Sequence, residues 1–297
     1  MERRDFLIAS TMAVGAASRA FAQATPTAAK LDRIAIMTYS FQRLLKAPGQ
    51  PESPTRTLEF FDMSQMFADR FKVHNLEVQH SHFASTELSY LKEFMARLAK
   101  TKSRVSNINL ELGQLSISSP DPVARTQAVD LTKRWIDHAI VLGSPRVMIN
   151  QGALTEDNKA IAIETLKRMT AYAKTKNIMV GMEPRGNGAR RGAPPPTVPA
   201  YQTLTDVAVG GGGYTNPDVG NFGGDQAFQH AGMRVMFPHT DGNCHIKMLT
   251  PSQYDLSAAI KLTKELGYKG LYSIEFEGAG DNYEGVQAVY DALLANL

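Results

Sequence analysis

Four short stretches of the sequence read as buried strands, and each carries one residue able to bind a metal ion: three end in an acidic residue and the fourth has a histidine in its middle. They are Ile178–Glu183, Tyr214–Asp218, Asn243–Lys247 and Leu271–Glu275. The candidate ligands are separated by 35, 27 and 30 residues, in the order Glu183, Asp218, His245 and Glu275. Each interval is about the length of one strand-plus-helix unit, which fits the carboxyl ends of successive strands of a parallel barrel.

The chemistry of these four residues indicates a divalent metal ion. Three carboxylates and one imidazole that converge at one point repel one another unless a cation joins them. Alternation along the segment places His245 on one face and Cys244 and Ile246 on the other. Oxygen-rich ligation with one imidazole suits manganese, cobalt, magnesium or zinc, and four ligands leave coordination positions for two substrate oxygens. We therefore predict one divalent ion, with manganese preferred.

Each residue of the set also has a structural interpretation. Glu183 could cap a helix or pair with a nearby arginine, and Asp218 could close an Asx turn. A single histidine such as His245 on an apolar strand is often a satisfied core residue, and Glu275 could pair with Lys247 on the neighbouring strand. The joint pattern at four consecutive strand ends favours the metal site over these separate roles.

The hydrophobic pattern predicts eight strands that alternate with helices, which indicates parallel β/α units. The expected strands are 33–41, 73–80, 104–110, 146–152, 178–183, 214–218, 243–247 and 271–275. The expected helices are 56–71, 87–100, 120–142, 155–176 (with Thr155 as N-cap), 200–209, 225–231, 252–266 and 282–297. The fold class is therefore α/β, a single-domain (β/α)8 TIM barrel. An open doubly wound sheet is the alternative, but there four ligands on consecutive strands would not converge.

The first two dozen residues have the features of an export signal. Arg3–Leu7 is a twin-arginine pattern, and the apolar run Leu7–Ala17 is too short to span a membrane. Ala20–Ala22 or Ala22–Ala24 supplies a small-x-small cleavage site. The alternative is a disordered cytosolic tail. We expect a twin-arginine signal peptide and a periplasmic or secreted protein.

The expected organisation is a signal peptide at 1–24, a linker at 25–32 and one barrel domain at 33–297. The net charge is +3, and because the leader holds three arginines and two acids, about +2 remains for the rest. No block of like charge indicates a nucleic-acid partner, and no later segment is apolar enough to span a membrane. The one cysteine, Cys244, cannot form an internal disulfide, and we interpret it as a packing residue.

Further polar residues at strand ends are candidates for binding a substrate. A glutamate on each of two opposite strands, Glu183 and Glu275, could act as base and acid on a carbon next to a carbonyl. The candidate substrate-binding residues are His80, His82, Asn109, Asn150, Arg185 and Lys247. The two histidines could equally be surface residues, and the arginine lies in a Gly/Pro/Arg-rich stretch that is typical of a solvated loop.

Four motifs at these positions resemble one known family. They are Gly181–Pro184 with Glu183, Asp218–Asn221, His245–Lys247 and the final ligand Glu275. They are similar to motifs of the sugar phosphate isomerase/epimerase family, also called the xylose isomerase-like TIM barrel. The resemblance covers most of residues 31–297 and is strongest in the second half. It implies that Glu183 and Glu275 are both ligands and the acid/base pair, around manganese or a related ion.

The chain departs from the family's pattern at two places. Pro184–Arg185 stands where many members have Asn-His, and Met248 stands where members often have an acid. Both departures bear on which substrate the protein binds more than on whether it binds a metal ion. The related endonuclease IV branch has additional histidine and acidic ligands that hold three zinc ions. The sequence shows no second set of ligands of this kind, and it shows no basic face that would indicate DNA binding.

The predicted function is a metal-dependent sugar isomerase or epimerase that abstracts a proton next to a carbonyl. Export favours a free sugar or sugar derivative as the substrate, because sugar phosphates are cytoplasmic metabolites. One alternative is a metal-dependent lyase, acting by β-elimination on a 3-keto-glycoside or as a dehydratase. Another is a non-catalytic sugar-binding barrel. The expected partner is a small carbohydrate, and the sequence leaves homo-oligomerisation open.

Overall fold

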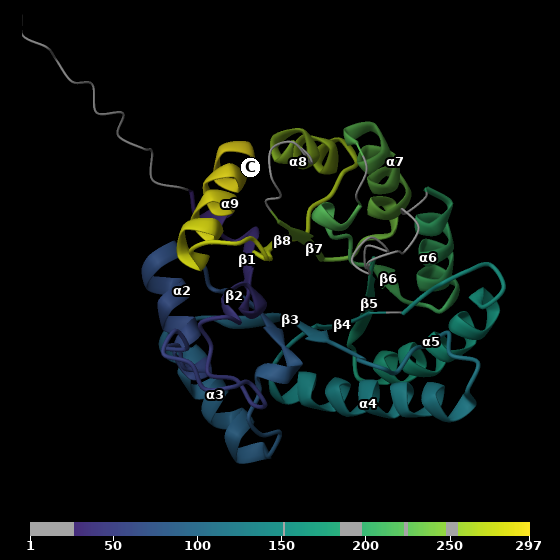
Figure 1. The fold of residues 1–297 in the computed structure, drawn as a ribbon, viewed down its shortest axis with the longest axis horizontal. Coiled ribbons are helices and arrows are strands. Elements are labelled where there is room, and N and C mark those ends of the chain that lie inside the picture. Colours follow the sequence, from purple (N-terminus) through teal and green to yellow (C-terminus); the bar gives the residue numbers. More distant parts are fainter. Residues whose placement is uncertain (1–26, 151, 185–197, 223–224, 248–254) are drawn as a thin grey trace, which may run out of the picture.

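Eight parallel strands form the centre of the molecule in the computed structural model, which describes residues 27–150, 152–184, 198–222, 225–247 and 255–297. In the view of Figure 1 the strands form a ring with the helices outside it. The strands are β1 Ile34–Met37, β2 Asn75–Gln79, β3 Arg104–Leu110, β4 Arg146–Asn150, β5 Met179–Glu183, β6 Tyr214–Thr215, β7 Asn243–Ile246 and β8 Leu271–Ile274.

The order of the strands in the sheet is β6-β5-β4-β3-β2-β1-β8-β7, so the first and last strands of the chain are neighbours. The two edges of this order, β6 and β7, are joined by a parallel bridge between Asp218 and His245. The backbone N–H of His245 donates to the carbonyl oxygen of Pro217 at 2.8 Å. The predicted TIM-barrel fold is confirmed, because an open doubly wound sheet has no contact between its edge strands.

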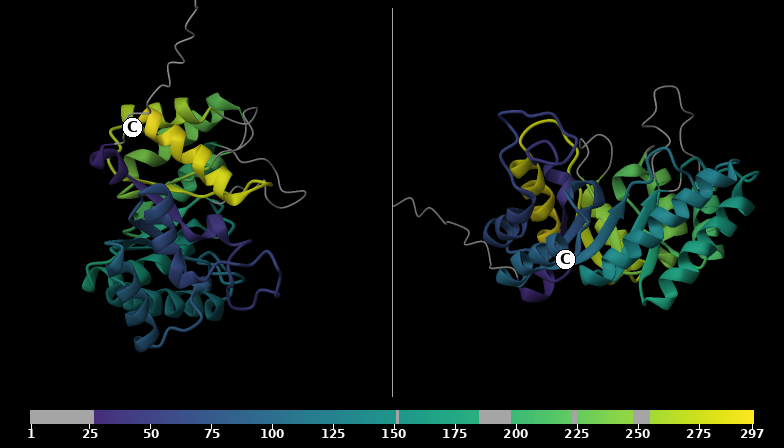
Figure 2. Two further views of the ribbon diagram at one scale, coloured as in Figure 1. Left: turned by 90° about the vertical axis from the view of Figure 1, so that its left-hand side faces the viewer. Right: turned by 90° about the horizontal axis from the view of Figure 1, so that it is seen from below.

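Helices cover the outside of the strands. The α-helices are α1 Ala28–Leu31, α2 Met63–Phe71, α3 Leu88–Lys100, α4 Pro122–Val141, α5 Lys159–Thr175, α6 Val198–Gly210, α7 Gln226–Met236, α8 Leu256–Glu265 and α9 Asn282–Asn296. Short 3₁₀ helices are η1 Thr38–Phe41, η2 Phe60–Asp62, η3 His80–His82, η5 Val219–Asn221 and η6 Phe237–His239. The last helix, α9, packs beside α2, where the ring centroids of Phe71 and Tyr290 are 6.0 Å apart (Figures 1 and 2).

The two faces of the strands differ in chemistry. The face toward the helices is apolar and buried, with Ile36, Leu76, Ile108, Ile149 and Ile246 among its residues. The face toward the barrel interior carries many polar side chains, as a contact between β7 and β2 shows. There the Nδ2 of Asn243 donates to the Oε2 of Glu77 at 3.0 Å. TIM-barrel interiors are usually filled by branched apolar residues, so a polar interior indicates that this space serves chemistry.

Local signals set most helix boundaries as expected. Asp121 caps α4, accepting from the backbone N–H of Val123 at 2.8 Å, and Pro122 occupies the first helical position. Gly143 follows α4 with a φ of 64°, a conformation that favours glycine. The prediction of Thr155 as an N-cap is wrong, because the residues after it form a turn and α5 begins only at Lys159.

Other differences lie at strand ends and at the amino terminus. The strand expected at 214–218 is reduced to Tyr214–Thr215, because Pro217 has no N–H to donate to a ladder. The described part of the expected linker contains the one-turn helix α1. The predicted signal peptide, Arg185 and Met248 lie outside the described residues. Among the helices of the described ranges, none is both long enough and apolar enough to cross a membrane.

Candidate metal centre and active site

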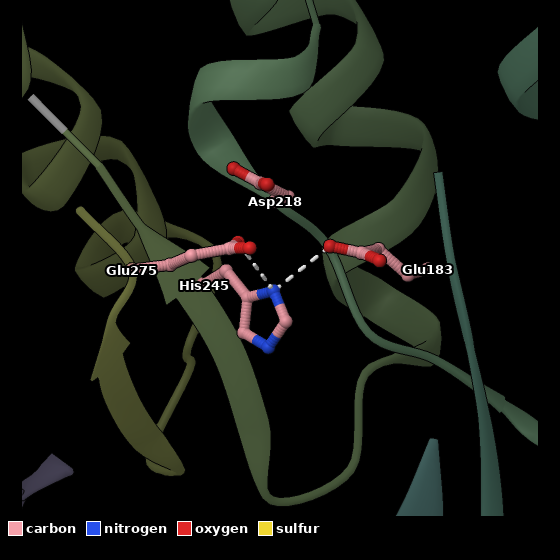
Figure 3. Close-up of side chains that lie close together, drawn as sticks. All are labelled: Glu183, Asp218, His245 and Glu275. Carbon is pink, nitrogen blue, oxygen red and sulfur yellow. Dashed lines mark hydrogen bonds and ion pairs between the residues drawn. The ribbon is translucent and has the colours of Figure 1, made fainter. Parts of the chain in front are cut away.

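The four candidate ligands meet in one buried cluster. Glu183 is the last residue of β5, Asp218 follows β6, His245 lies in β7 and Glu275 follows β8. One potential ligand atom from each side chain lies within 4.8 Å of those of the others, and all four residues are buried. Figure 3 shows the three carboxylates and the imidazole turned toward one another from these separate segments. The sequence pattern therefore located a real convergence of side chains.

Asp218 divides its two carboxylate oxygens between the backbone and the site. Its Oδ1 accepts from the backbone N–H of Gly220 at 2.9 Å, so the Asx turn that the sequence offered as an alternative is present. Its Oδ2 lies 2.7 Å from the Nζ of Lys247. A Cβ on Gly220 would lie 2.4 Å from the Cγ of Lys247. Glycine at that position is therefore needed to let the lysine reach Asp218.

His245 is held by carboxylates on both ring nitrogens. Its Nδ1 lies 2.9 Å from the Oε1 of Glu183 and 3.1 Å from the Oε2 of Glu275. Its Nε2 lies 2.8 Å from the Oε1 of Glu77, on the opposite side of the ring. Burial lowers the pKa of His245, but the charges of Glu77, Glu275 and Glu183 outweigh burial and raise that pKa well above its usual value. Without an ion, the imidazole donates from both nitrogens.

Lys247 supplies the second positive charge. Its Nζ lies 3.2 Å from the Oε2 of Glu275 and 2.7 Å from the Oε2 of Glu277, in addition to its contact with Asp218. The predicted pairing of Glu275 with Lys247 is therefore present together with the ligand cluster. Burial lowers the pKa of Lys247, but the three carboxylates raise it well above its usual value. Burial raises the pKa of Glu275, and Lys247 and His245 reverse this effect and lower it.

The donor set and its charge fit a divalent cation. Four buried carboxyl groups, from Glu77, Glu183, Asp218 and Glu275, face the two cationic groups of the site, the ammonium of Lys247 and the imidazole of His245. Acidic groups outnumber basic ones here, and at Asp218 burial, together with the charges of Glu275 and Glu183, raises the pKa to about 7 despite Lys247. A divalent ion would balance this excess, and loss of the Nδ1 proton would make His245 a ligand. Among the described residues, the group of acidic and histidine side chains arranged to hold an ion is Glu183, Asp218, His245 and Glu275.

The two candidate substrate histidines lie in η3, directly after β2. His80 is partly buried, and its Nδ1 accepts from the backbone N–H of Glu111 at 3.2 Å. His82 is buried, with its Nδ1 3.0 Å from the Oγ1 of Thr38 and its ring against the edge of Phe60. Burial lowers the pKa of His82 to about 3, so this ring is neutral at ordinary pH. These contacts give both histidines structural roles and leave His80 the more accessible of the two.

The remaining candidates lie at strand ends. The Nδ2 of Asn150 donates to the Oε2 of Glu111 at 2.7 Å, which couples the ends of β3 and β4. Asn109 is buried, and its Oδ1 accepts no hydrogen bond from the described residues. Lys247, as described above, borders the ligand cluster. An orphaned buried oxygen such as that of Asn109 needs a partner from water or a ligand.

Glu77 is the site residue that the sequence analysis missed. Its strand was predicted, but its carboxylate was not linked to the four ligands. The available signal was an acid between Leu76 and Val78, in the middle of a strand that is otherwise buried. Ionisable residues are rarely fully buried without a partner, so an acid at an inward position of a core strand indicates a partner across the barrel.

Comparison with known proteins supports the resemblance seen in the motifs. The family model described as xylose isomerase-like TIM barrel matches residues 58–194. This range includes Glu183 but precedes the other three ligands, so it lies mostly before the motifs that suggested the resemblance. No curated protein matches the chain significantly in sequence.

Solved structures of similar fold come from several bacteria. A sugar phosphate isomerase/epimerase from Parabacteroides distasonis is 18% identical, with a TM-score of 0.65 over 89% of this chain and 96% of that one. A 3-keto-D-glucoside 4-epimerase from E. coli is 11% identical, with a TM-score of 0.61 over 89% and 99%. A xylose isomerase-like TIM barrel protein from Mycobacterium smegmatis in complex with magnesium is 18% identical, with a TM-score of 0.60 over 91% and 99%. At these identities the likeness shows the fold alone, and the family model adds a sequence match over residues 58–194.

Proposed function

We propose that this protein is an exported, divalent-metal-dependent isomerase or epimerase of a free sugar or sugar derivative. The observation that carries the proposal is the buried convergence of Glu183, Asp218, His245 and Glu275 at the carboxyl ends of four strands. In TIM-barrel enzymes, this end of the barrel is where active sites lie. The family match and the epimerases among the proteins of similar fold support the reaction class.

The four side chains would hold one ion, with manganese our first choice. When bound, such an ion supplies a positive charge that stabilises negative charge on a substrate oxygen next to the reacting carbon. The protein's own contribution is to exclude water and to fix the donors, since all four ligands are buried. Lys247, beside Asp218, offers an ammonium for a substrate hydroxyl or carbonyl oxygen.

Two carboxylates that reach the same point of the site from different strands suit a proton transfer to and from carbon. Glu183 and Glu275 approach the same ring nitrogen, Nδ1, from β5 and from the end of β8. One carboxylate would remove the proton from the carbon next to the carbonyl. In an epimerase, the other returns a proton to the opposite face of that carbon. In an isomerase, the proton returns to the neighbouring carbon.

A lyase is the second candidate, and the position of Lys247 favours it. The ammonium lies 3.2 Å from Glu275 and 2.7 Å from Glu277, so it is a proton donor beside the proposed base. After removal of the proton by a carboxylate, the bond to the leaving group breaks and Lys247 protonates the departing oxygen. A 3-keto-glycoside would then release its aglycone, and a dehydratase would release water.

The test is proton exchange at the reacting carbon. The protein, loaded in turn with manganese, cobalt, magnesium and zinc, is incubated in deuterated water with ketoses, aldoses and 3-keto-glycosides. NMR and mass spectrometry then follow deuterium at the carbon next to the carbonyl. An isomerase or epimerase gives a deuterated isomer with no released group, and a lyase releases an aglycone or water. Glu183→Gln is expected to bind the sugar without exchange. Binding of a sugar by the parent with no exchange, unaffected by chelation, would contradict the proposal and indicate a binding protein.

Export is the part of the proposal that rests on the leader sequence. Arg3 and Arg4 precede the apolar run, as in twin-arginine signals. Replacement of both by lysine should keep the protein in the cytoplasm, as measured by cell fractionation. Equal export of the parent and this double variant would show that the leader is not read as a twin-arginine signal.

A further inference from the structure

Glu77 is buried on β2, on the far side of His245 from the carboxylates of Glu183 and Glu275. Its side chain is fully buried, and its Oε1 lies 2.8 Å from the Nε2 of His245. In the order of the sheet, β1 and β8 lie between β2 and β7, so this contact crosses the barrel interior. The geometry therefore separates the two ring nitrogens, with Nε2 toward Glu77 and Nδ1 toward the ligand cluster.

Two asparagine side chains donate hydrogen bonds to the Glu77 carboxylate, one to each oxygen. The Nδ2 of Asn107 donates to Oε1 at 3.0 Å, and the Nδ2 of Asn243 donates to Oε2 at 3.0 Å. Asn243 is itself oriented, because its Nδ2 also donates to the Oδ1 of Asn216 at 3.0 Å. An ionised carboxylate only accepts hydrogen bonds. The proton between Glu77 and His245 therefore belongs to the Nε2 of the histidine.

We infer that Glu77 is a positioning residue that fixes His245 in the tautomer with its proton on Nε2, so that Nδ1 presents its lone pair to a divalent cation. A neutral imidazole carries a proton on only one nitrogen, and a carboxylate that holds the proton on Nε2 leaves Nδ1 free to ligate. Carboxylates that orient a ligating histidine typically contribute a factor of about 10 to 100 in metal affinity. This inference rests on the proposed function, because it presupposes that the cluster holds an ion.

A glutamine at position 77 would disturb this arrangement without changing its shape. The carboxamide has one oxygen and one NH2 group, so one of the three donors, from His245, Asn107 or Asn243, would face another donor. Glu111→Gln is a matched control, since it removes one carboxylate at the end of the neighbouring strand β3. The side chain of Glu111 accepts a hydrogen bond from Asn150, and Glu111 is not a member of the ligand cluster.

The experiment combines a metal titration with NMR of the histidine ring. Calorimetric titration with zinc is run on the parent, Glu77→Gln and Glu111→Gln, and 15N-histidine spectra of the zinc-loaded parent are recorded. We expect Glu77→Gln to weaken zinc binding by about 10-fold to 100-fold, and Glu111→Gln to leave it within a few-fold. In the parent spectrum, His245 should carry its proton on Nε2 and none on Nδ1.

Two results would overturn the inference alone. One is zinc affinity of Glu77→Gln equal to that of the parent, and the other is a parent spectrum with the proton on Nδ1. The second needs no variant, so the inference stays testable if Glu77→Gln does not fold. A parent that binds no divalent ion would instead overturn the proposed function, so the two failures are distinguishable.

Discussion

The two faces of the same strands have different roles: the outer face packs against the helices, and the inner face carries the polar side chains of the candidate site. In β3, Ile108 packs in the apolar core toward the helices, whereas Asn107 donates to Glu77 inside the barrel. In β7, Cys244 and Ile246 belong to that core, whereas His245 lies among the candidate ligands. Adjacent residues of one strand therefore have different roles, one in the apolar core and the next in the candidate site. The barrel is stabilised from its outside, which leaves its interior available for charged and polar side chains.

The largest expected effect on the inner face comes from Glu275→Gln. Loss of a general acid or base typically slows a reaction by about 10²-fold to 10⁴-fold, and this variant also removes a ligand. We expect kcat to fall by that factor while the circular dichroism spectrum is retained. Glu277→Gln is the control, because Glu277 also pairs with Lys247, but its side chain is 42% exposed and it is not in the cluster. Equal losses in the two variants would remove Glu275 from its proposed role.

A substitution on the outer face should lower the stability of the protein and leave its metal content unchanged. Ile108 is fully buried, and Ile108→Ala should lower the free energy of unfolding by about 2–5 kcal/mol through lost burial and a cavity. Metal stoichiometry should not change, since the side chain faces the helices. Urea unfolding and metal analysis of the same preparation check both statements. A full loss of metal in a folded Ile108→Ala protein would break the separation between the two faces.

A smaller effect is expected from His82, which lies outside the ligand cluster. Burial holds its pKa at about 3, below the value of about 6.5 in the unfolded chain, so the unfolded state binds a proton first as pH falls. This residue's contribution to stability is present above about pH 6.5 and is lost as pH falls from there toward 3. Between about pH 7.5 and 5.5 the loss is about 1.4 kcal/mol.

The measurement for His82 is chemical unfolding of the parent and of His82→Gln at both pH values. The difference between their pH dependences removes the contribution of the neighbouring His80, whose pKa burial also lowers. An identical pH dependence in the parent and His82→Gln would show that the ring of His82 titrates normally in the folded protein.

The sequence predicted the fold and the cluster because both follow from periodic signals. The four ligands lie in or just after successive strands, at intervals of one β/α unit, and a barrel is the arrangement that brings such positions together. Helix caps were also readable where a single residue sets them, as Asp121 does for α4. Thr155 was misread because a cap motif shows where a helix is able to begin, and the turn that follows delays α5.

Contacts across the barrel were not predictable in the same way. Strand pairing shifts between Leu76–Val105 and Glu77–Asn107, and this irregularity brings Asn107 opposite Glu77. No local pattern specifies such a shift. The contact between Glu77 and His245 joins residues 168 positions apart, so only the closed barrel shows that they meet. The sequence could show that Glu77 is an acid in a core strand, but not which side chain it contacts.

The central claim is that the inner face at the carboxyl ends of the strands holds a divalent ion, and metal content tests it most directly. The parent, His245→Ala and Cys244→Ala are purified without chelator after growth with manganese and zinc, and their metals are measured by mass spectrometry. Neighbouring residues of one strand thus probe opposite faces. We predict about one divalent ion per chain in the parent and in Cys244→Ala, and its loss from a folded His245→Ala. No ion in the parent, or an ion retained by His245→Ala, would contradict the claim.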